Sequence, residues 1–249
     1  MSDPEPRRGR EHNVKGTREA ILNAAEAVFA EHGFDGARFD AIAKASGYNK
    51  SLIGQYFGDK LGLYTEVNKR IDRDINELGA RLMAPLLEDE TIASDAHRLR
   101  AFLETAIGAR FDYLLEHPRL MRIIHWEQAE GWQTFAKIFS QFETEDIDQL
   151  RTLFSRVRSA GLLRSDFDPL LQLVLAEQMC WSYLAAIPLY QLILPGEDLT
   201  SAAALARARE HIVAFVARGL MGDPPGDEAV ETRERMAMNR PKESNDDTK

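Results

Sequence analysis

Residues 39–64 read FDAIAKASGYNKSLIGQYFGDKLGLY, and the short helices in this stretch decide the fold. Phe39–Ser46 has the pattern of a helix, and Gly47 ends it because glycine adopts a positive φ without steric cost. Asn49 is a favourable N-cap for a second helix over Lys50–Phe57, since its side chain can accept a hydrogen bond from the new helix. The stretch therefore predicts two short helices joined by a tight turn, with a third helix directly behind them.

The spacing of three residues indicates how the two helices cross. Ala43 is small, as a close helix crossing requires, and Gly47 and Ile53 follow at intervals of four and six positions. This order is typical of a helix-turn-helix. Ile53, Tyr56 and Phe57 supply the buried side of the second helix. On the spacing alone, an ordinary corner between two helices remains the alternative to a DNA-binding unit.

Length and composition indicate a helical globular protein. The chain has 249 residues, 44% of them apolar, which suffices for one large domain or two smaller ones. A single cysteine, Cys180, excludes an intramolecular disulfide and suits a reducing cytosol. No apolar segment follows the N-terminal arginines, so we expect a cytoplasmic protein without a secretory signal. Polar residues interrupt the most apolar run, Leu170–Leu194, which favours a buried helix over a membrane span.

The net charge of −9 is unevenly distributed. Residues 1–62 hold nine Lys/Arg and nine Asp/Glu, so the whole excess of acid lies in the rest of the chain. An acidic protein with one charge-balanced region can still bind DNA through that region. The basic residues of the polar segment 1–15 could reach phosphates, or the segment could be a solvated disordered tail.

Helical periodicity continues on both sides of the opening stretch. Thr17 is predicted to cap a first helix that ends at Gly33. Asp59 is predicted to cap a long fourth helix that stops near Ala84, because Pro85 follows. Beyond this point the chain shows no strand-like alternation, so the expected fold class is all-α, with about nine helices.

The charged patch Glu143–Asp148 is a point where a long helix could be interrupted, and Pro188 is expected to kink another. The helices expected after Pro85 are Ser94–Glu116, Pro118–Glu130, Trp132–Ala160, Asp168–Leu194 and Thr200–Leu220.

Taken together, the pattern resembles the TetR family of bacterial transcriptional regulators. The resemblance is close over roughly Thr17–Tyr64 and is carried by Gly33-Phe34, Ile42-Ala43, Ala45, Gly47, Ser51, Tyr56-Phe57, Lys60 and Leu63. Three residues depart from the family pattern. Arg38 stands where a capping Thr is usual, Tyr48 where Val is usual, and Gly54 where Tyr is common in the recognition helix. The departures affect the DNA contacts rather than the fold.

In a helix-turn-helix, the exposed N-terminal part of the second helix enters the major groove. Gln55 has the amide geometry for adenine, Lys50 can reach guanine or a phosphate, and Leu52 can touch a thymine methyl. Phosphate contacts are expected at helix ends. The full set of predicted DNA-binding residues is Thr17, Arg38, Lys44, Asn49, Lys50, Ser51, Leu52, Gln55, Tyr56 and Lys60.

A single helix-turn-helix makes few contacts, which favours a homodimer that reads an inverted repeat in double-stranded DNA. The last two helices are apolar over more faces than one core needs, so we expect them to form the dimer contact, although burial inside one chain is the alternative. The resemblance further implies a small-molecule effector held by the middle helices. Candidate residues are Phe111, His125, Trp126, Glu127, Gln128, Trp132, Phe135, Phe139, Trp181 and Tyr183.

These expectations divide the chain at four points. The predicted units are a flexible arm (1–15), a DNA-binding domain (16–62), an effector-binding and dimerisation domain (63–222) and a disordered tail (223–249). The function that follows is a ligand-released repressor, with a regulator that needs no effector as the alternative. An enzyme or a protein-binding scaffold is a more distant alternative, because no Glu-x-x-His pair or glycine-rich phosphate loop is present. No cofactor or metal site is expected.

Overall fold

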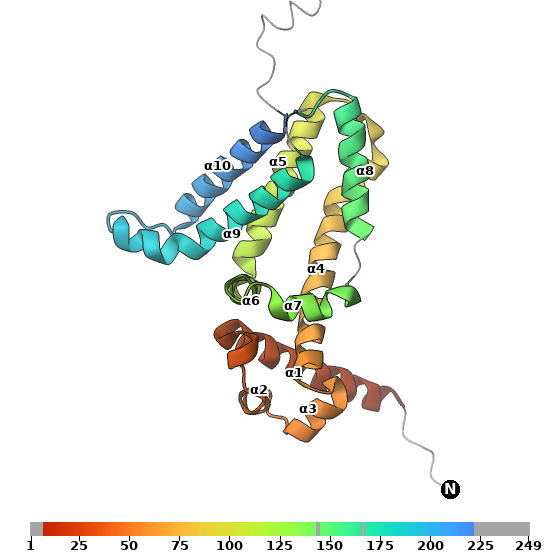
Figure 1. Ribbon diagram of the computed structural model, residues 1–249, viewed down its shortest axis with the longest axis vertical. Helices are drawn as coiled ribbons and strands as arrows, with labels where there is room; N and C mark the ends of the chain where they lie inside the picture. Colours follow the sequence, from red (N-terminus) through yellow and green to blue (C-terminus); the bar gives the residue numbers. More distant parts are fainter. Residues whose placement is uncertain (1–6, 143–144, 165, 167, 222–249) are drawn as a thin grey trace, which may run out of the picture.

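The computed structural model describes residues 7–142, 145–164, 166 and 168–221. Over these residues the chain is all-α, as the sequence predicts, with two short 3-10 helices and no strand (Figure 1). The described part contains ten α-helices, one more than predicted. The elements are α1 Arg7–Gly36, α2 Phe39–Ser46, α3 Lys50–Phe57, α4 Lys60–Glu88, η1 Glu90–Ala93, α5 Ala96–Glu116, α6 Pro118–Ala129, α7 Gln133–Ile138, η2 Phe139–Gln141, α8 Glu145–Ser159, α9 Pro169–Ile193 and α10 Ala202–Met221.

The first three helices and the start of α4 form a small domain around one apolar cluster, at the lower end of the molecule in Figure 1. Three ion pairs join α1 to α4: Arg18 with Glu66, and Arg70 with both Glu19 and Glu26. Burial of the apolar side chains supplies the main driving force for this domain. Its fully buried members include Ile21, Leu22, Phe29, Ile42, Ile53 and Leu63.

The turn chemistry predicted around the helix-turn-helix is confirmed. Gly47 has φ 76°, and its N–H donates to the last turn of α2. The side chain of Asn49 accepts a hydrogen bond from the Leu52 N–H at 2.8 Å, which caps α3. Asp59 caps α4 in the same way, through the Gly62 N–H at 2.8 Å. The bounds of α2 and α3 are those predicted.

The start of α1 differs from the prediction. α1 begins at Arg7, so the part of segment 1–15 that the structure describes is helical rather than a flexible arm. Each residue added to an existing helix gains one backbone hydrogen bond, which lets α1 extend into polar sequence. Thr17 therefore lies inside the helix, 9% exposed, and is not its cap. Gly33 leaves helical geometry near the predicted end, with φ 68°.

α4 also differs, because it continues through Pro85 to Glu88. Proline has no N–H, so Pro85 cannot donate the helical hydrogen bond that the carbonyl of Arg81 would receive. The helical hydrogen bonds resume after the proline, and the Asp89 N–H donates to the Pro85 carbonyl at 2.9 Å. α4 is thus one long rod with a single interrupted turn near its C-terminal end.

The single long helix predicted over Trp132–Ala160 is wrong, because this stretch forms α7, η2 and α8. Gly131 and Trp132 both have positive φ, 68° and 61°, in the turn that follows α6. At the far side of η2, Phe142 is extended, with ψ 145°. The centroid of its ring lies 5.3 Å from that of Phe135, so a half-buried aromatic contact replaces helix continuation.

The larger domain is built around α5, which contacts η1, α6, α9 and α10 (Figure 1). Asp95 caps α5 and Asp168 caps α9, each by accepting backbone N–H bonds in the first turn. The predicted disordered tail, 223–249, lies outside the described residues. Buried members of this core include Leu99, Phe111, Leu114, Val157, Cys180 and Val216.

Candidate DNA-binding surface and its link to the larger domain

α3 is held by its apolar side and presents its polar side to solvent. Ile53 is 0% exposed and Phe57 is 7% exposed in the core of the small domain. Ser51 and Gln55 are exposed on the opposite side, and Leu52 is half-buried between the two faces. A Cβ at Gly54 would meet no atom within 4 Å, so packing does not require glycine there. The helix therefore offers a free polar surface of the size and shape that a major groove admits.

Two basic residues beside α3 have different surroundings. Lys50, in the first turn of α3, forms an exposed ion pair with Asp40 of α2 at 2.5 Å. Lys44 of α2 is exposed, and no hydrogen bond or ion pair joins it to a described residue. A DNA contact by Lys50 would require it to leave Asp40, whereas Lys44 has no described partner to give up before meeting a phosphate.

The remaining predicted DNA-binding residues differ in exposure and in their contacts. Arg38 is exposed at the N-cap position of α2 and makes no side-chain capping bond. Tyr56 is half-buried, with its ring centroid 6.0 Å from that of Phe57. Asn49 is exposed, but its side-chain oxygen already caps α3. Thr17 is buried in α1, so the predicted role at a helix end does not fit its position.

The Lys60 side chain contacts the end of α1 rather than extending into solvent. Its ammonium group donates to the backbone carbonyls of Phe34, Asp35 and Ala37 at 2.8, 3.3 and 3.1 Å. The same group lies 4.5 Å from the centroid of the Phe34 ring. An ammonium has three donors, and these carbonyls take all three. In this geometry Lys60 caps α1 and joins it to α4, so a contact with a DNA phosphate would compete with these three hydrogen bonds.

The predicted effector residues fall into two separate groups. The first lies in the core of the larger domain, where Phe111 is 1% exposed and its ring is 6.4 Å from that of Tyr183. Trp181 is half-buried against the same core. The Gln128 side chain donates to Gln178 at 3.3 Å and so links α6 to α9.

The second group lies against the small domain. The rings of Trp132, Phe135 and Phe139 follow one another at 6.0 Å between neighbouring centroids. A Cβ added to Gly33 would lie 3.0 Å from the Trp126 ring, so Trp126 packs closely against the backbone there. His125, the remaining candidate, is half-buried on α6. The two groups therefore have different neighbours: the first packs in the core of the larger domain and the second against the core of the small domain.

Two buried polar atoms on α9 have no hydrogen-bond partner among the described residues: the second carboxylate oxygen of Glu177 and the indole N–H of Trp181. The other Glu177 oxygen accepts a hydrogen bond from Arg110 at 2.6 Å. Burial, followed by the charge of Glu177, raises the pKa of the Cys180 thiol to about 12. The thiol therefore stays protonated and unreactive at neutral pH.

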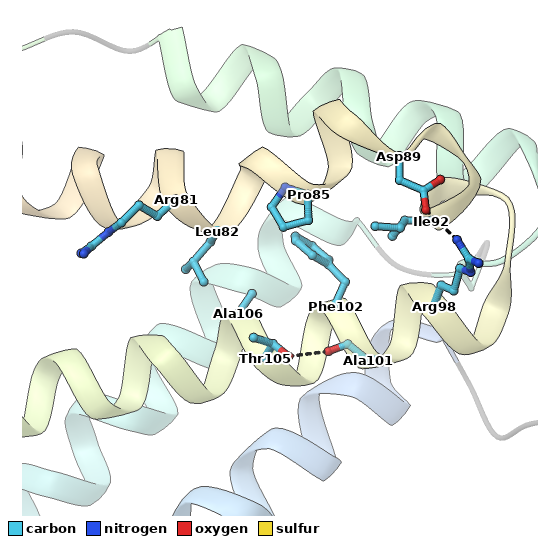
Figure 2. A pocket seen from close by; sticks show the side chains of 10 residues that line it. All are labelled: Arg81, Leu82, Pro85, Asp89, Ile92, Arg98, Ala101, Phe102, Thr105 and Ala106. Atoms are coloured by element: carbon cyan, nitrogen blue, oxygen red, sulfur yellow. Dashed lines mark hydrogen bonds and ion pairs between the residues drawn. The ribbon is translucent and has the colours of Figure 1, made fainter.

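A cleft of about 470 Å³ lies elsewhere, between the C-terminal part of α4, η1 and α5 (Figure 2). None of the predicted effector residues lines it. No sequence signal marks this place, because the helical pattern that runs up to Pro85, with Arg81 one turn before it, is common to any packed helix. The cleft is lined by Arg81, Leu82, Pro85, Asp89, Ile92, Arg98, Ala101, Phe102, Thr105 and Ala106.

A buried polar contact joins the small domain to the larger one. The Tyr64 hydroxyl of α4 donates to one carboxylate oxygen of Glu127 at 2.5 Å, and the Phe135 N–H donates to the other at 3.1 Å. Glu127 and Tyr64 are both 2% exposed. Burial, together with the bond to Glu127, raises the pKa of Tyr64 far above its ordinary value. Glu127, one of the predicted effector residues, is thus part of the domain junction.

α6 also contacts α1 directly. Arg122 and Trp126 both donate to the carbonyl of Ala30, at 2.8 and 3.3 Å. Ile123 of α6 and Ile138 of α7 are buried in the core of the small domain. Displacement of α6 would therefore disturb α1 and α4 together, since both carry buried contacts to it.

α9 is less buried in a single chain than the sequence suggests. By length and composition it is also the one described helix that could cross a membrane. A contiguous group of apolar side chains that is not buried within one chain is typical of a surface that contacts another molecule. The exposed large apolar residues on α9 and α10, including the segment just after α9, are Leu171, Val174, Leu175, Leu189, Tyr190, Leu192, Ile193, Leu194 and Phe215.

Comparison with known proteins assigns this arrangement to a family. Residues 21–67, which span the helix-turn-helix, match the family of bacterial regulatory proteins named after tetR. Residues 100–216 match the tetracyclin repressor-like C-terminal domain, and the two matches cover more than half of the chain. The chain belongs to the TetR family. It is therefore a DNA-binding transcriptional regulator, and the family's members are regulators rather than enzymes.

Individual relatives agree with this assignment. The chain is 27% identical over 169 residues to the HTH-type transcriptional repressor NicS of Pseudomonas putida, a match covering 67% of this chain and 75% of NicS. It is 33% identical over 116 residues to the repressor SCO4008 of Streptomyces coelicolor, which covers 47% of this chain and 52% of that protein. The crystal structure of SCO4942 from Streptomyces coelicolor superposes with a TM-score of 0.54 at 26% identity, covering 83% and 99% of the two chains.

Proposed function

We propose that this TetR-family protein is a cytoplasmic, homodimeric repressor that leaves an inverted-repeat operator when a small ligand binds its larger domain. The observation that carries the proposal is the free polar face of α3, with Ser51 and Gln55 exposed and Ile53 and Phe57 buried behind them. We infer repression rather than activation because two relatives, NicS and SCO4008, are named as repressors.

The dimer is supported by the exposed apolar surface of α9 and α10. Phe215 is 62% exposed on α10, and Val174 is 54% exposed on α9. Packing these helices against the same helices of a second copy would form a four-helix bundle with two-fold symmetry. The same symmetry would present two copies of α3 to two half-sites about one helical turn apart.

Sedimentation analysis tests the dimer with one variant and one control. Phe215→Asp places a charge in the proposed interface without opening a core, so we expect the dimer to dissociate at micromolar concentration. Val14→Asp changes an exposed apolar residue of α1, 48% exposed, and should leave the dimer intact. A Phe215→Asp protein that sediments like the wild type would exclude this interface.

The route for ligand control is the buried junction between the domains. Tyr64 lies on α4 and Glu127 on α6, so their hydrogen bond ties the helix behind α3 to the larger domain. A ligand that shifts either helix would change how the two α3 helices are placed in the dimer. Because ligand and DNA would then favour different states, each would weaken binding of the other by the same factor.

Mobility-shift titration on the DNA upstream of the coding region tests the proposal as a whole. We expect specific binding by the wild type, and a loss of discrimination at one position per half-site in Gln55→Ala, equivalent to about 1–3 kcal/mol. Gln133→Ala alters an exposed glutamine on α7 and serves as the matched control. Equal behaviour of the two variants on operator and scrambled DNA would refute the role of α3.

A further inference from the structure

The cleft between α4 and α5 has two ends of different charge (Figure 2). At one end Arg98 forms an ion pair with Asp89 at 2.6 Å and donates to the Thr91 hydroxyl at 2.8 Å. Asp89 also accepts from the N–H and hydroxyl of Thr91, which hold the pKa of its carboxyl below the usual range. The positive charge at this end is therefore already balanced.

The other end carries a cation that has no counter-ion among the described residues. Arg81 is exposed, and no hydrogen bond or ion pair joins it to any described residue. In Figure 2 its side chain extends along the gap between α4 and α5, away from the Asp89–Arg98 pair. A guanidinium in this position can take a carboxylate through two parallel hydrogen bonds.

The middle of the cleft is apolar. Phe102 rises from α5 towards Pro85 of α4, and Leu82 points into the same gap (Figure 2). Ile92, Ala101 and Ala106 also line the cleft. The Thr105 hydroxyl donates to the carbonyl of Ala101 at 2.8 Å, so its proton is used within α5. An apolar body fits this surface, with few polar groups to satisfy.

We infer that this cleft binds an amphipathic organic anion, with its carboxylate at Arg81 and its apolar body along Leu82, Pro85 and Phe102. The regulatory meaning of the site rests on the proposed function, whereas binding itself does not. The volume of about 470 Å³ lies within the range of small-molecule pockets. The occupant is a small acid rather than a protein segment. The cleft offers one cation that is unpaired among the described residues and one apolar gap, which suit one carboxylate and one hydrocarbon chain.

The position of the cleft explains how this acid would act on DNA binding. α4 begins at Lys60 against the small domain and reaches the cleft at Arg81 and Pro85. At Pro85 the helix lacks one backbone hydrogen bond, so bending there meets less resistance than elsewhere along the rod. A ligand that separates Pro85 from Phe102 would therefore move α4 at its weakest turn.

Isothermal titration with the full-length protein tests the site. The probe is sodium decanoate below its micellar concentration, and decanol and decylammonium chloride serve as neutral and cationic probes with the same chain. We expect decanoate to bind at one site per chain, and the other two to bind at least fivefold more weakly. If decanol or decylammonium bound with the same affinity as decanoate, the inference would be overturned.

Two variants and a control locate the site. Arg81→Gln should weaken decanoate about fivefold, the loss expected for one solvent-exposed charge pair. Arg73→Gln removes an exposed arginine from the same helix outside the cleft and should leave binding unchanged. Ala101→Trp changes an exposed position and places an indole in the gap, so it should abolish binding. Wild-type affinity in both Arg81→Gln and Ala101→Trp would assign decanoate to another surface and overturn the inference.

The mobility shift separates this inference from the proposed function. Decanoate binding that depends on Arg81 supports the site, whatever its effect on DNA. If such binding left the affinity for DNA unchanged, the ligand-released mechanism would fail while the site remained. If no carboxylate bound and DNA binding persisted, the site would be refuted and the regulator would stand.

Discussion

Lys60 provides a direct test of the structure against the resemblance. The family pattern predicts a phosphate contact, whereas the structure directs the ammonium to three carbonyls at the end of α1. Lys60→Met keeps the apolar stem and removes the charge. Charge-assisted hydrogen bonds contribute about 1.5–3 kcal/mol, and a cation over an aromatic ring adds about 0.5–1 kcal/mol. Since such terms are not additive, we expect a loss of about 2–3 kcal/mol.

Two measurements distinguish the roles. Thermal unfolding followed by circular dichroism should show a midpoint about 4–10 °C lower in Lys60→Met, while the salt dependence of DNA binding should keep its slope. Lys44→Met is the matched control, because Lys44 is exposed and has no described partner. It should keep its stability and lose about one unit of salt slope. A Lys60→Met protein with wild-type stability and a reduced salt slope would refute the capping role.

Three further predictions follow from single contacts. Tyr64→Phe removes the donor to buried Glu127 without changing the ring, so the free energy of unfolding should fall by about 1.5–3 kcal/mol in urea titrations; an unchanged midpoint would show that the junction is not held by this bond. Asn49→Ala should cost about 1 kcal/mol through loss of the α3 cap, and Asn49→Asp, which keeps the acceptor, should restore it; equal stability of both variants would contradict the cap. The pKa of Cys180 is raised to about 12 in the folded protein, whereas the thiol of the unfolded chain ionises at about pH 8.5. The contribution of the protonated thiol to the free energy of unfolding is therefore constant below about pH 8.5. It falls by up to about 1.4 kcal/mol per pH unit as pH rises towards 12. Urea midpoints between pH 8 and 10.5 should therefore fall more steeply for the wild type than for Cys180→Ala, and parallel slopes would show that the thiol is not protected.

The helix-turn-helix could be predicted because its signals are local. Gly47, Asn49 and Asp59 each act on the backbone within three or four residues, so the sequence alone determines the turn and both caps. The same local reasoning failed at Thr17, because a helix that packs well can extend beyond a good capping residue. It failed at Pro85 because one missing hydrogen bond is tolerated in a long helix.

The contacts between distant segments could not be predicted from spacing. Lys60 is separated from Phe34 by 26 positions and Glu127 from Tyr64 by 63, and nothing in a single sequence pairs them. Most of the predicted effector residues were chosen by aromatic character, which does not distinguish a pocket wall from a core. Phe111 proved to be core, and Trp126 lies at the domain junction. The cleft at Arg81 depends on how α4 and α5 diverge, which is a property of the packed structure.

A footprint on the DNA upstream of the coding region tests the central claim most directly. With purified full-length protein, we predict two protected half-sites related by two-fold symmetry, with centres about 10 base pairs or a multiple of that distance apart. Ser51→Ala combined with Gln55→Ala should remove protection of the specific site at the same protein concentration. The absence of any protected palindrome, or protection that survives the double substitution, would contradict the account of α3 as the recognition helix.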